Sequence, residues 1–423
     1  ELNFIATKPG QVDSPVVTVT YTTIDTPAWN VDDNGDWSFA ENWLQNVVPN
    51  GPGVAADFSS FPQSGDTTVT LDTDHTVGSM VFGNPDLFNW EIASVNGSIL
   101  TLDAGGATPV IEIASQEATI SAPVAGTAGF SKTGPDGLVL SGANTYEGVT
   151  TVTAGRLIGA SNTAFGASTI TLGTAAADAQ LYLANRADVA NDVTVDADGT
   201  GAVVIGGENT GSGSDAASFD GTLTLNRPTT LSGEIVEDRL AINGPITGPV
   251  GTLTVSGGAR TTFRSTESNF VGELVITGTG TILQAAVASD GEVIPDASNV
   301  TVETDAILQL AIAANGTESI NALNGDGTVR TYVSATGTGG YPGVLAVGSA
   351  DGSGTFSGSL VDSVSALSLT KLGTGTPTLS GASTYPGATT VSDGTLSVTG
   401  SLDGGTAIAV NTPGVLELGD GTS

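Results

Sequence analysis

The residues that could take part in catalysis or metal binding are few in this 423-residue chain. His75 is its one histidine and stands close to Asp72 and Asp74, so it can serve at most one catalytic triad and excludes a histidine-rich metal site. Asp72 ends a short alternating run, "TTVTLD", and Asp74 and His75 follow it; we interpret all three as solvent-facing residues of a turn. Cysteine is absent, so the fold cannot depend on disulfide bonds.

Carboxylates are closely spaced in "VDDNGDW", where Asp32, Asp33 and Asp36 surround Asn34. Oxygen ligands at this spacing begin an EF-hand calcium loop, but Trp37 stands where that loop needs glycine, and its twelfth position holds no glutamate. The hypothesis that this segment binds calcium in another geometry stays open. We therefore assign no catalytic, cofactor-binding or metal-binding residue from the sequence, and calcium is the one cofactor left open.

Basic residues are rare: Lys and Arg number 10 against 44 Asp and Glu, for a formal net charge of -34. Such a surface repels nucleic acids and anionic membranes, so we expect neither as a partner. The arginines are scattered, and the nearest pair is Arg260 and Arg264, followed by Glu267. No carboxylate pair suited to a glycosidase stands out from the acidic background. We favour a non-enzymatic protein, with a polysaccharide-degrading enzyme as the least favoured alternative.

The sequence predicts an all-β protein, so strands and turns must position the acidic and basic residues described above. The chain holds 59 glycines and many Thr, Ser, Ala and Val, a composition that disfavours helices and favours strands. Short alternating runs such as "GTLTLN" and "GELVITGTG" recur, and Gly, Asn, Asp or Pro ends each of them. Similar phrases return every 20 to 30 residues or so, which predicts a β-solenoid of stacked coils. No segment approaches the roughly 18 apolar residues that a membrane-spanning helix needs.

Residues 1–66 differ in texture from the rest of the chain. They contain Trp29, Trp37 and Trp43 together with several Phe and Pro residues. We predict that residues 1–66 form an aromatic-rich N-terminal cap, and that residues 67–423 form the parallel β-helix whose open end this cap covers.

One phrase of the sequence is repeated. "GLVLSGANTYEGVTTVTAGRL" at 137–157 returns as "TPTLSGASTYPGATTVSDGTL" at 376–396. The repeat motifs as a whole span 129–158 and 368–398, and a degenerate copy at 251–282 has Phe270 in the tyrosine position. One coil of a solenoid cannot bury its apolar face alone, so repetition of this kind indicates coils that stack on one another.

We interpret the repeat as structural. Leu138 and Leu140 are expected to point into the core, with Val152 on the next strand. Asn144 suits a turn and can hydrogen-bond to a neighbouring coil. Tyr146 is expected to pack over that corner, so its replacement by alanine is expected to cost less than a charge at Leu140.

Both strong copies resemble the autotransporter-associated β-strand repeat, also called the passenger-associated transport repeat. Its usual form reads like L-x-K-x-G-x-G-x-L-x-L-S-G-x-N-T-Y-x-G-x-T-x-V-x-x-G-x-L. The residues of the first copy that fit it are Lys132, Gly134, Gly137, Leu138, Leu140, Ser141, Gly142, Asn144, Thr145, Tyr146, Gly148, Thr150, Val152, Gly155 and Leu157. In the second copy Ser383 replaces the Asn, and Pro386 precedes the Gly. The resemblance implies a right-handed parallel β-helix that a bacterium exports to its surface or beyond, for adhesion, surface coating or matrix structure more often than catalysis.

The preferred function is a secreted or cell-surface structural protein that self-associates into an extracellular fibre, layer or matrix. Val410–Leu418 alternates apolar with small residues, and an uncovered strand there would pair with another copy. The alternative is a monomeric adhesin that binds surface glycans, with Trp29, Trp37, Trp43 and Trp90 as stacking candidates. The expected partners are therefore copies of the chain itself or surface glycans.

Overall fold

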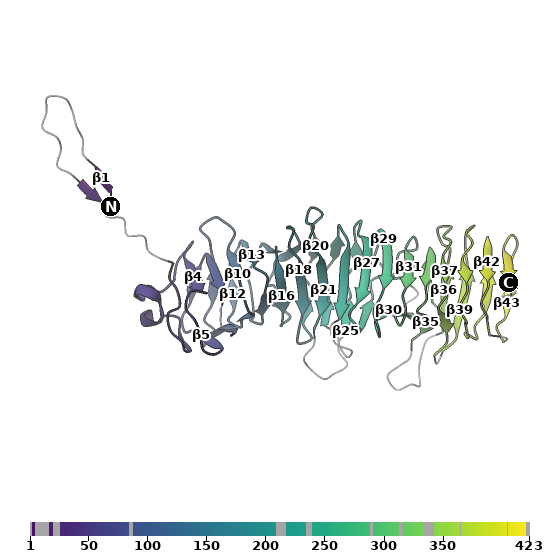
Figure 1. Cartoon of the computed structure of the whole chain (residues 1–423), viewed down its shortest axis with the longest axis horizontal. Coiled ribbons are helices and arrows are strands. Elements are labelled where there is room, and N and C mark those ends of the chain that lie inside the picture. Colours follow the sequence, from purple (N-terminus) through teal and green to yellow (C-terminus); the bar gives the residue numbers. More distant parts are fainter. Residues whose placement is uncertain are drawn as a thin grey trace, which may run out of the picture.

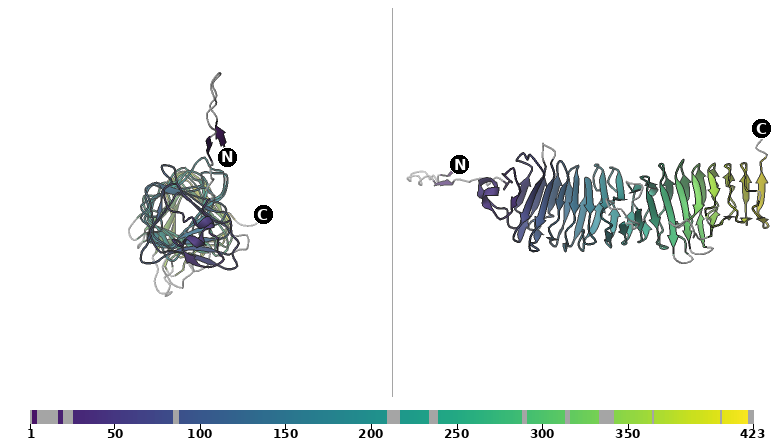
Figure 2. Two further views of the ribbon diagram at one scale, coloured as in Figure 1. Left: turned by 90° about the vertical axis from the view of Figure 1, so that its left-hand side faces the viewer. Right: turned by 90° about the horizontal axis from the view of Figure 1, so that it is seen from below.

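Stacked turns of parallel strands form an elongated β-solenoid in the computed structural model (Figure 1). The structure describes residues 2–4, 17–19, 26–83, 88–208, 217–233, 239–287, 291–312, 316–332, 342–363, 365–403 and 405–419. Strands of successive turns lie side by side on three faces, which together enclose the core (Figure 2). The predicted all-β parallel solenoid is confirmed, while its right-handed sense stays a prediction.

The first face is a parallel ladder of 17 strands that runs along the rod. In ladder order its strands are β3 (Gly35–Asp36), β5 (Thr67–Leu71), β8 (Trp90–Ser94), β11 (Ala118–Ile120), β14 (Gly137–Leu140), β16 (Gly155–Gly159), β18 (Ala179–Leu183), β21 (Val203–Gly207), β24 (Thr229–Gly233), β27 (Gly251–Ser256), β29 (Gly272–Ile276), β31 (Asn299–Val302), β34 (Ala322–Gly325), β37 (Thr355–Phe356), β40 (Thr378–Leu379), β42 (Thr395–Val398) and β44 (Val415–Leu418).

The second face follows the first in most turns and consists of two sheets. A three-stranded sheet holds β6 (His75–Val77), β9 (Leu100–Leu102) and β12 (Val124–Ala125). An eight-stranded sheet continues with β19 (Asp188–Val189), β22 (Ala217–Phe219), β25 (Arg239–Ile242), β28 (Arg260–Phe263), β30 (Ile282–Val287), β32 (Ile307–Ile312), β35 (Thr328–Thr331) and β38 (Ser359–Val361).

The third face completes each turn and is also divided between two sheets. The nine-stranded sheet holds β4 (Ala55–Phe58), β7 (Ser79–Phe82), β10 (Val110–Ile113), β13 (Gly129–Thr133), β15 (Val149–Val152), β17 (Thr169–Leu172), β20 (Val193–Val195), β23 (Leu223–Leu225) and β26 (Ile246–Thr247). The five-stranded sheet holds β33 (Thr317–Ile320), β36 (Gly343–Val347), β39 (Leu367–Lys371), β41 (Thr389–Val391) and β43 (Ile408–Val410).

An aromatic cluster fills the N-terminal end of the solenoid. Trp37 packs against Trp43 and Phe58, with ring centroids 5.1 and 5.6 Å apart, and Phe58 stacks on Phe82 at 4.8 Å. Two short 3-10 helices, η1 (Ala40–Asn42) and η2 (Leu44–Asn46), lie in this segment. The ladders already begin here, because β3 pairs with β5 and β4 pairs with β7. Further towards the N-terminus, β1 (Leu2–Phe4) and β2 (Val17–Val19) pair antiparallel. The domain boundary after residue 66 stays a prediction.

The core is built from alternate residues of each strand. In β14 Leu138 and Leu140 are buried while their neighbours are partly exposed, and Val152 is buried in β15. Burying a side chain of this size stabilises the fold by about 1.5–3 kcal/mol relative to leaving it in water. The inward positions predicted for these three residues are confirmed.

One polar residue of the repeat, Asn144, joins successive turns. Asn144 accepts a hydrogen bond from Val124 N at 2.8 Å and donates one to Ala164 O at 2.7 Å, so it links the preceding and the following turn as predicted. Tyr146 was predicted to lie over a corner, and this is wrong. Its ring is fully buried in the core, 5.4 Å from the ring of Phe130, and its hydroxyl accepts a hydrogen bond from Thr150.

Lys132, which the repeat shares with Lys371, has a structural role that its sequence position did not reveal. Its side chain is buried, and its ammonium group donates hydrogen bonds to the carbonyl oxygens of Gly134 (2.8 Å), Ala154 (3.0 Å) and Asp136. These carbonyls belong to two successive turns of the chain, so one ammonium satisfies buried acceptors of both. Burial lowers the pKa of Lys132 to about 8. Lys132 therefore links the corners of two successive turns through hydrogen bonds.

Glycine is required where neighbouring turns approach each other closely. Gly134 has a φ of 77°, and a Cβ atom added there would lie 2.1 Å from the carbonyl oxygen of Ile113 in the preceding turn. An L-amino acid with a side chain rarely adopts this backbone conformation, and here it would also clash with backbone that cannot move aside. This explains the glycine of the repeat at this corner.

Candidate functional site

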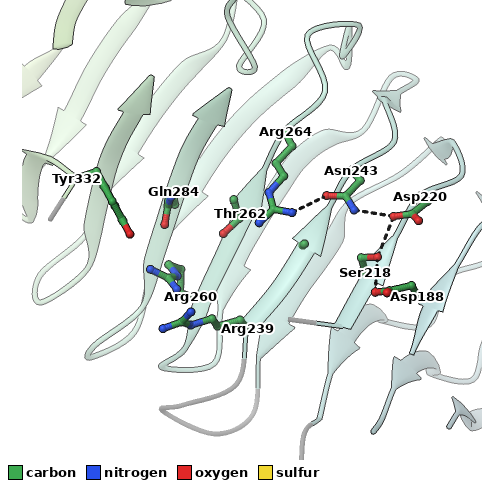
Figure 3. Close-up of a pocket in the computed structure, with 11 residues that line it drawn as sticks. Asp188, Ser218, Asp220, Arg239, Asn243, Arg260, Thr262, Arg264, Gln284 and Tyr332 are labelled. Atoms are coloured by element: carbon green, nitrogen blue, oxygen red, sulfur yellow. Dashed lines mark hydrogen bonds between the residues drawn. The ribbon is translucent and has the colours of Figure 1, made fainter. Parts of the chain in front are cut away.

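A groove with a volume of about 430 Å³ lies on the second face of the solenoid (Figure 3). It crosses strands from several successive turns, so its lining comes from parts of the chain more than 140 residues apart. The lining residues are Asp188, Ser218, Asp220, Arg239, Ala241, Asn243, Arg260, Thr262, Arg264, Gln284 and Tyr332.

The floor of the groove is a row of side chains, most of them small, that the ladder holds in register. Ser218 pairs with Ala241, Ala241 with Thr262, and Thr262 with Gln284. Because side chains alternate along a strand, this row faces away from the core, into which the neighbouring Leu240 points. Small residues on three successive strands, Ser218, Ala241 and Thr262, leave the hollow that the larger side chains surround.

A chain of hydrogen bonds fixes the polar groups at one end of the groove (Figure 3). Arg264 Nη1 donates to Asn243 Oδ1 at 3.2 Å, and Asn243 Nδ2 donates to Asp220 Oδ1 at 2.6 Å. Ser218 Oγ lies 2.8 Å from Asp220 Oδ1 and 2.7 Å from Asp188 Oδ1. Four turns of the solenoid are thereby linked, so these groups are held in place before any ligand arrives.

Positive charge gathers in the middle of the groove. Arg239 and Arg260 are register partners on adjacent strands, and their side chains lie next to each other (Figure 3). Burial, and then the charges of Arg239 and Arg264, lower the pKa of Arg260. Arg260 Nε is buried and has no hydrogen-bond partner in the structure. The guanidinium group of Arg260 is therefore partly buried beside two other positive charges, and its Nε has no hydrogen-bond acceptor.

A second cavity, of about 1070 Å³, lies on the third face between β26 and β33. Its lining includes Glu292, Asp296 and Thr317. Glu318, next to Thr317 in β33, is fully buried and accepts a hydrogen bond from Ile294 N at 2.7 Å. Burial raises the pKa of Glu318 to about 8, and the charges of Glu292 and Asp296 raise it further. Burial also raises the pKa of Glu292 to about 7. The arrangement stabilises protonated carboxyl groups near neutral pH.

These pKa values predict a loss of stability as the pH rises. Glu318 has a pKa of about 8 in the folded chain against 4.5 for an ordinary glutamate, so the folded state holds the proton more tightly. Its stabilising effect is complete below pH 4.5 and is lost as the pH rises towards 8, at about 1.4 kcal/mol for each unit of pKa difference. The denaturant midpoint should therefore be lower at pH 8 than at pH 5, and Glu318→Gln should reduce this difference.

The comparison needs a surface control and an upper pH limit. Glu147→Gln removes an exposed carboxylate and should leave the pH dependence as in the parent chain. Measurements stop at pH 8 because Lys132, whose pKa is lowered, gives the opposite trend between pH 8 and 10.5. An equal loss of stability in Glu318→Gln and in the parent would contradict the assignment to Glu318.

His75 and its two acidic neighbours do not form a catalytic triad. The prediction that all three face solvent is wrong for His75, which is buried with its ring centroid 5.6 Å from that of Trp37. Its Nδ1 lies 2.9 Å from the carbonyl oxygen of Thr73. Asp72 accepts a hydrogen bond from Ser38 N, and Asp74 accepts one from Ile99 N. His75 is a core residue of the first turns.

The tryptophans considered for glycan stacking are also core residues. Trp29, Trp37, Trp43 and Trp90 are all buried, so none presents its ring face to a sugar, and this part of the adhesin hypothesis is wrong. The indole nitrogens of three of them donate to backbone carbonyl oxygens, for example Trp37 Nε1 to Pro49 O at 3.0 Å. Large apolar rings gain most from burial at the end of the stack.

The acidic segment considered for calcium binds backbone instead. Asp32 accepts a hydrogen bond from Ser64 N at 2.6 Å, and Asn34 accepts one from Thr68 N at 2.6 Å. Within the described ranges, no group of three or more His, Cys, Asp or Glu side chains is arranged to hold a metal ion. No described helix is both long and apolar enough to cross a membrane.

Of the arginine pair singled out in the sequence, both members line the groove, whereas Glu267 does not. Sequence reasoning missed the rest of the site. Arg239 and Tyr332 lie near this pair because the ladder aligns strands that are unequally spaced along the chain. Asp188 pairs with Ser218, 30 residues later, whereas Ser218 pairs with Ala241, only 23 residues later. A repeat of fixed length, applied to the sequence, would therefore not have aligned the residues of the groove.

Comparisons with known proteins agree with the repeats found in the sequence. The family described as passenger-associated-transport-repeat matches residues 130–158 and 369–398, and the predicted resemblance is thereby confirmed. "Adhesin BmaC autotransporter" from Brucella suis biovar 1 (strain 1330) is similar, with 37% identity over 139 residues. The match covers 31% of this chain and 4% of that much longer protein. No solved structure gives a significant match.

Proposed function

We propose that this chain is a non-enzymatic part of a bacterial autotransporter passenger, exposed on the cell surface or released from it, and that it acts as an adhesin. The observation that carries the proposal is the pair of passenger-associated transport repeats built into one long solenoid. The similarity to a protein named as an autotransporter adhesin supports the same role.

The side chains of the described residues support a binding role over catalysis. The one histidine is packed in the core, and the acidic segment at 32–36 is engaged with backbone amides. The groove instead combines fixed charges with amide and hydroxyl groups, which suits recognition of a polar ligand. A solenoid presents such groups along an extended surface, as repeat proteins do when they bind large partners.

Self-association into a fibre, which we favoured from the sequence, stays a prediction. The strand residues on which it rests include Val410, Val415 and Leu418, all of which are exposed in β43 and β44. Exposed apolar residues on a strand favour pairing with another strand, whereas a net charge of -34 opposes close contact between copies. Sedimentation velocity of the purified chain, with and without calcium, distinguishes a monomer from an assembly.

Adhesion is tested with the purified chain coupled to latex beads. We expect coated beads to attach to cultured epithelial cells or to polysaccharide-coated surfaces more than albumin-coated beads do. The same polysaccharides are then incubated with the chain in solution, and no reducing ends should be released. Attachment at the albumin level on every surface would contradict the adhesin proposal, and steady release of reducing ends would contradict its non-enzymatic part.

A further inference from the structure

The groove of the second face concentrates positive charge, which is rare in the rest of the chain. Arg239, Arg260 and Arg264 are three of only 10 basic residues in a chain with 44 acidic ones. Within the groove, Arg260 Nε is buried without a hydrogen-bond partner, and exposed Arg264 donates to the neutral side chain of Asn243. Clustered guanidinium groups repel one another and lose hydration, so an anion that binds between them removes both costs.

The chemistry of the groove favours a carboxylate or a sulfate group as that anion. The planar guanidinium group binds both groups through two parallel hydrogen bonds. Beside the arginines the groove offers the hydroxyl of Thr262 and the side-chain amides of Asn243 and Gln284. Gln284 Oε1 is buried and has no hydrogen-bond partner in the structure. Such neutral donors and acceptors match the hydroxyl groups of a sugar.

The shape of the groove favours an extended polymer. Asp188 stands at one end and Tyr332 at the other (Figure 3). The ladder from β19 to β35 contains seven strands and therefore six spacings, which at about 4.8 Å each make the distance along it about 29 Å. A linear chain of sugars lying along the solenoid axis contacts groups from every turn that it crosses.

A polysaccharide fits these groups better than a nucleic acid does. Asp188 and Asp220 stand at one end of the groove, where they repel phosphate but accept hydrogen bonds from sugar hydroxyls. The net charge of -34 repels any polyanion at long range, an acidic polysaccharide as well as a nucleic acid. At an ionic strength of about 0.15 M this repulsion is screened beyond about 8 Å, whereas contacts with the groove arginines are screened much less.

We infer that the groove on the second face binds an anionic polysaccharide that carries carboxylate or sulfate groups. This inference rests on the proposed adhesin function and names the class of ligand and the residues that recognise it. Arg260 and Arg264 bind the acidic groups, while Thr262, Asn243 and Gln284 bind the hydroxyl groups of the neighbouring sugars.

The test is calorimetric titration of the purified chain at about 0.15 M salt, where non-contact electrostatics are weak. The probes are polygalacturonate for carboxylates, heparin for sulfates, neutral dextran, and a DNA duplex. We expect binding of polygalacturonate, heparin or both, and none of dextran. The double variant Arg260→Gln/Arg264→Gln should lower the affinity at least about tenfold, because it removes two charge-assisted contacts. Arg186→Gln removes one positive charge outside the groove and should leave the affinity unchanged.

Arg264 is exposed, so Arg264→Gln alone keeps the test interpretable if the double variant unfolds, as judged by circular dichroism. Lack of binding by both acidic polysaccharides, equal binding by parent and variants, or tighter binding of DNA would each overturn the inference. The bead assay separates this result from the proposed function. Adhesion without binding of either polysaccharide leaves the adhesin proposal intact, and binding in solution without adhesion leaves the groove assignment intact.

Discussion

Leu140→Asp is expected to prevent stable folding of the central turns of the solenoid. Leu140 is 1% exposed in β14, and it pairs with the equally buried Ile120 of the preceding turn. Truncating a buried leucine already costs about 2–5 kcal/mol, and an unpaired carboxylate in that place costs several kcal/mol more. The sum approaches the whole stability of an ordinary domain, about 5–15 kcal/mol. Circular dichroism during guanidinium unfolding measures the loss.

The matched control is Val149→Asp, because Val149 is 44% exposed and lies on the strand that follows β14. It introduces the same charge on an aliphatic position without burying it, so we expect a change within about 0.5 kcal/mol. Leu379→Asp, at the corresponding position of the second copy, should resemble Leu140→Asp. Equal midpoints for Leu140→Asp and the parent chain would contradict the inward orientation of this residue.

Features of the fold that follow from local pattern could be predicted from the sequence. The run "GLVL" places Leu138 and Leu140 on one face of β14 and Val139 on the other, because side chains on a strand point to opposite sides in turn. The repetition of that phrase indicated stacking, since a single turn leaves its apolar side uncovered. Asn144 was predicted to join neighbouring turns because its side chain carries both a donor and an acceptor.

Features that depend on register between distant turns could not be predicted. Arg239 and Arg260 belong to different phrases of the sequence and meet only because β25 and β28 pair in one particular register. Lys132 carries a charge, which favours an exposed position on general grounds, yet three carbonyl oxygens converge on its ammonium group. The carbonyl oxygens meet at Lys132 because of the way the backbone turns at Gly134 and Ala154, and no local sequence pattern specifies these turns.

Tyr146 shows the same limit, and its buried ring predicts a larger loss of stability on truncation than a position over a corner would. Its position between turn residues in "GANTYEG" placed it over a corner, but the corner folds its ring inwards against Phe130. Burial raises the pKa of its hydroxyl, which stays protonated and bonded to Thr150. Tyr385 of the second copy is likewise buried, with its hydroxyl 2.6 Å from Thr389 Oγ1. The tyrosine is therefore a core residue of the repeat.

Tyr146→Ala is accordingly expected to cost about 3–5 kcal/mol, because removing a buried aromatic ring leaves a cavity between rigid turns. Tyr146→Phe keeps the ring and loses only the hydroxyl. We expect it to cost about 1 kcal/mol, since Thr150 keeps its second partner, Ser168 Oγ at 3.0 Å. Guanidinium unfolding of both variants and of the parent chain measures the contribution of the ring and that of the hydroxyl separately. If Tyr146→Ala proved no more destabilising than Tyr146→Phe, the ring would contribute little to the core, and the corner position inferred from the sequence would be restored.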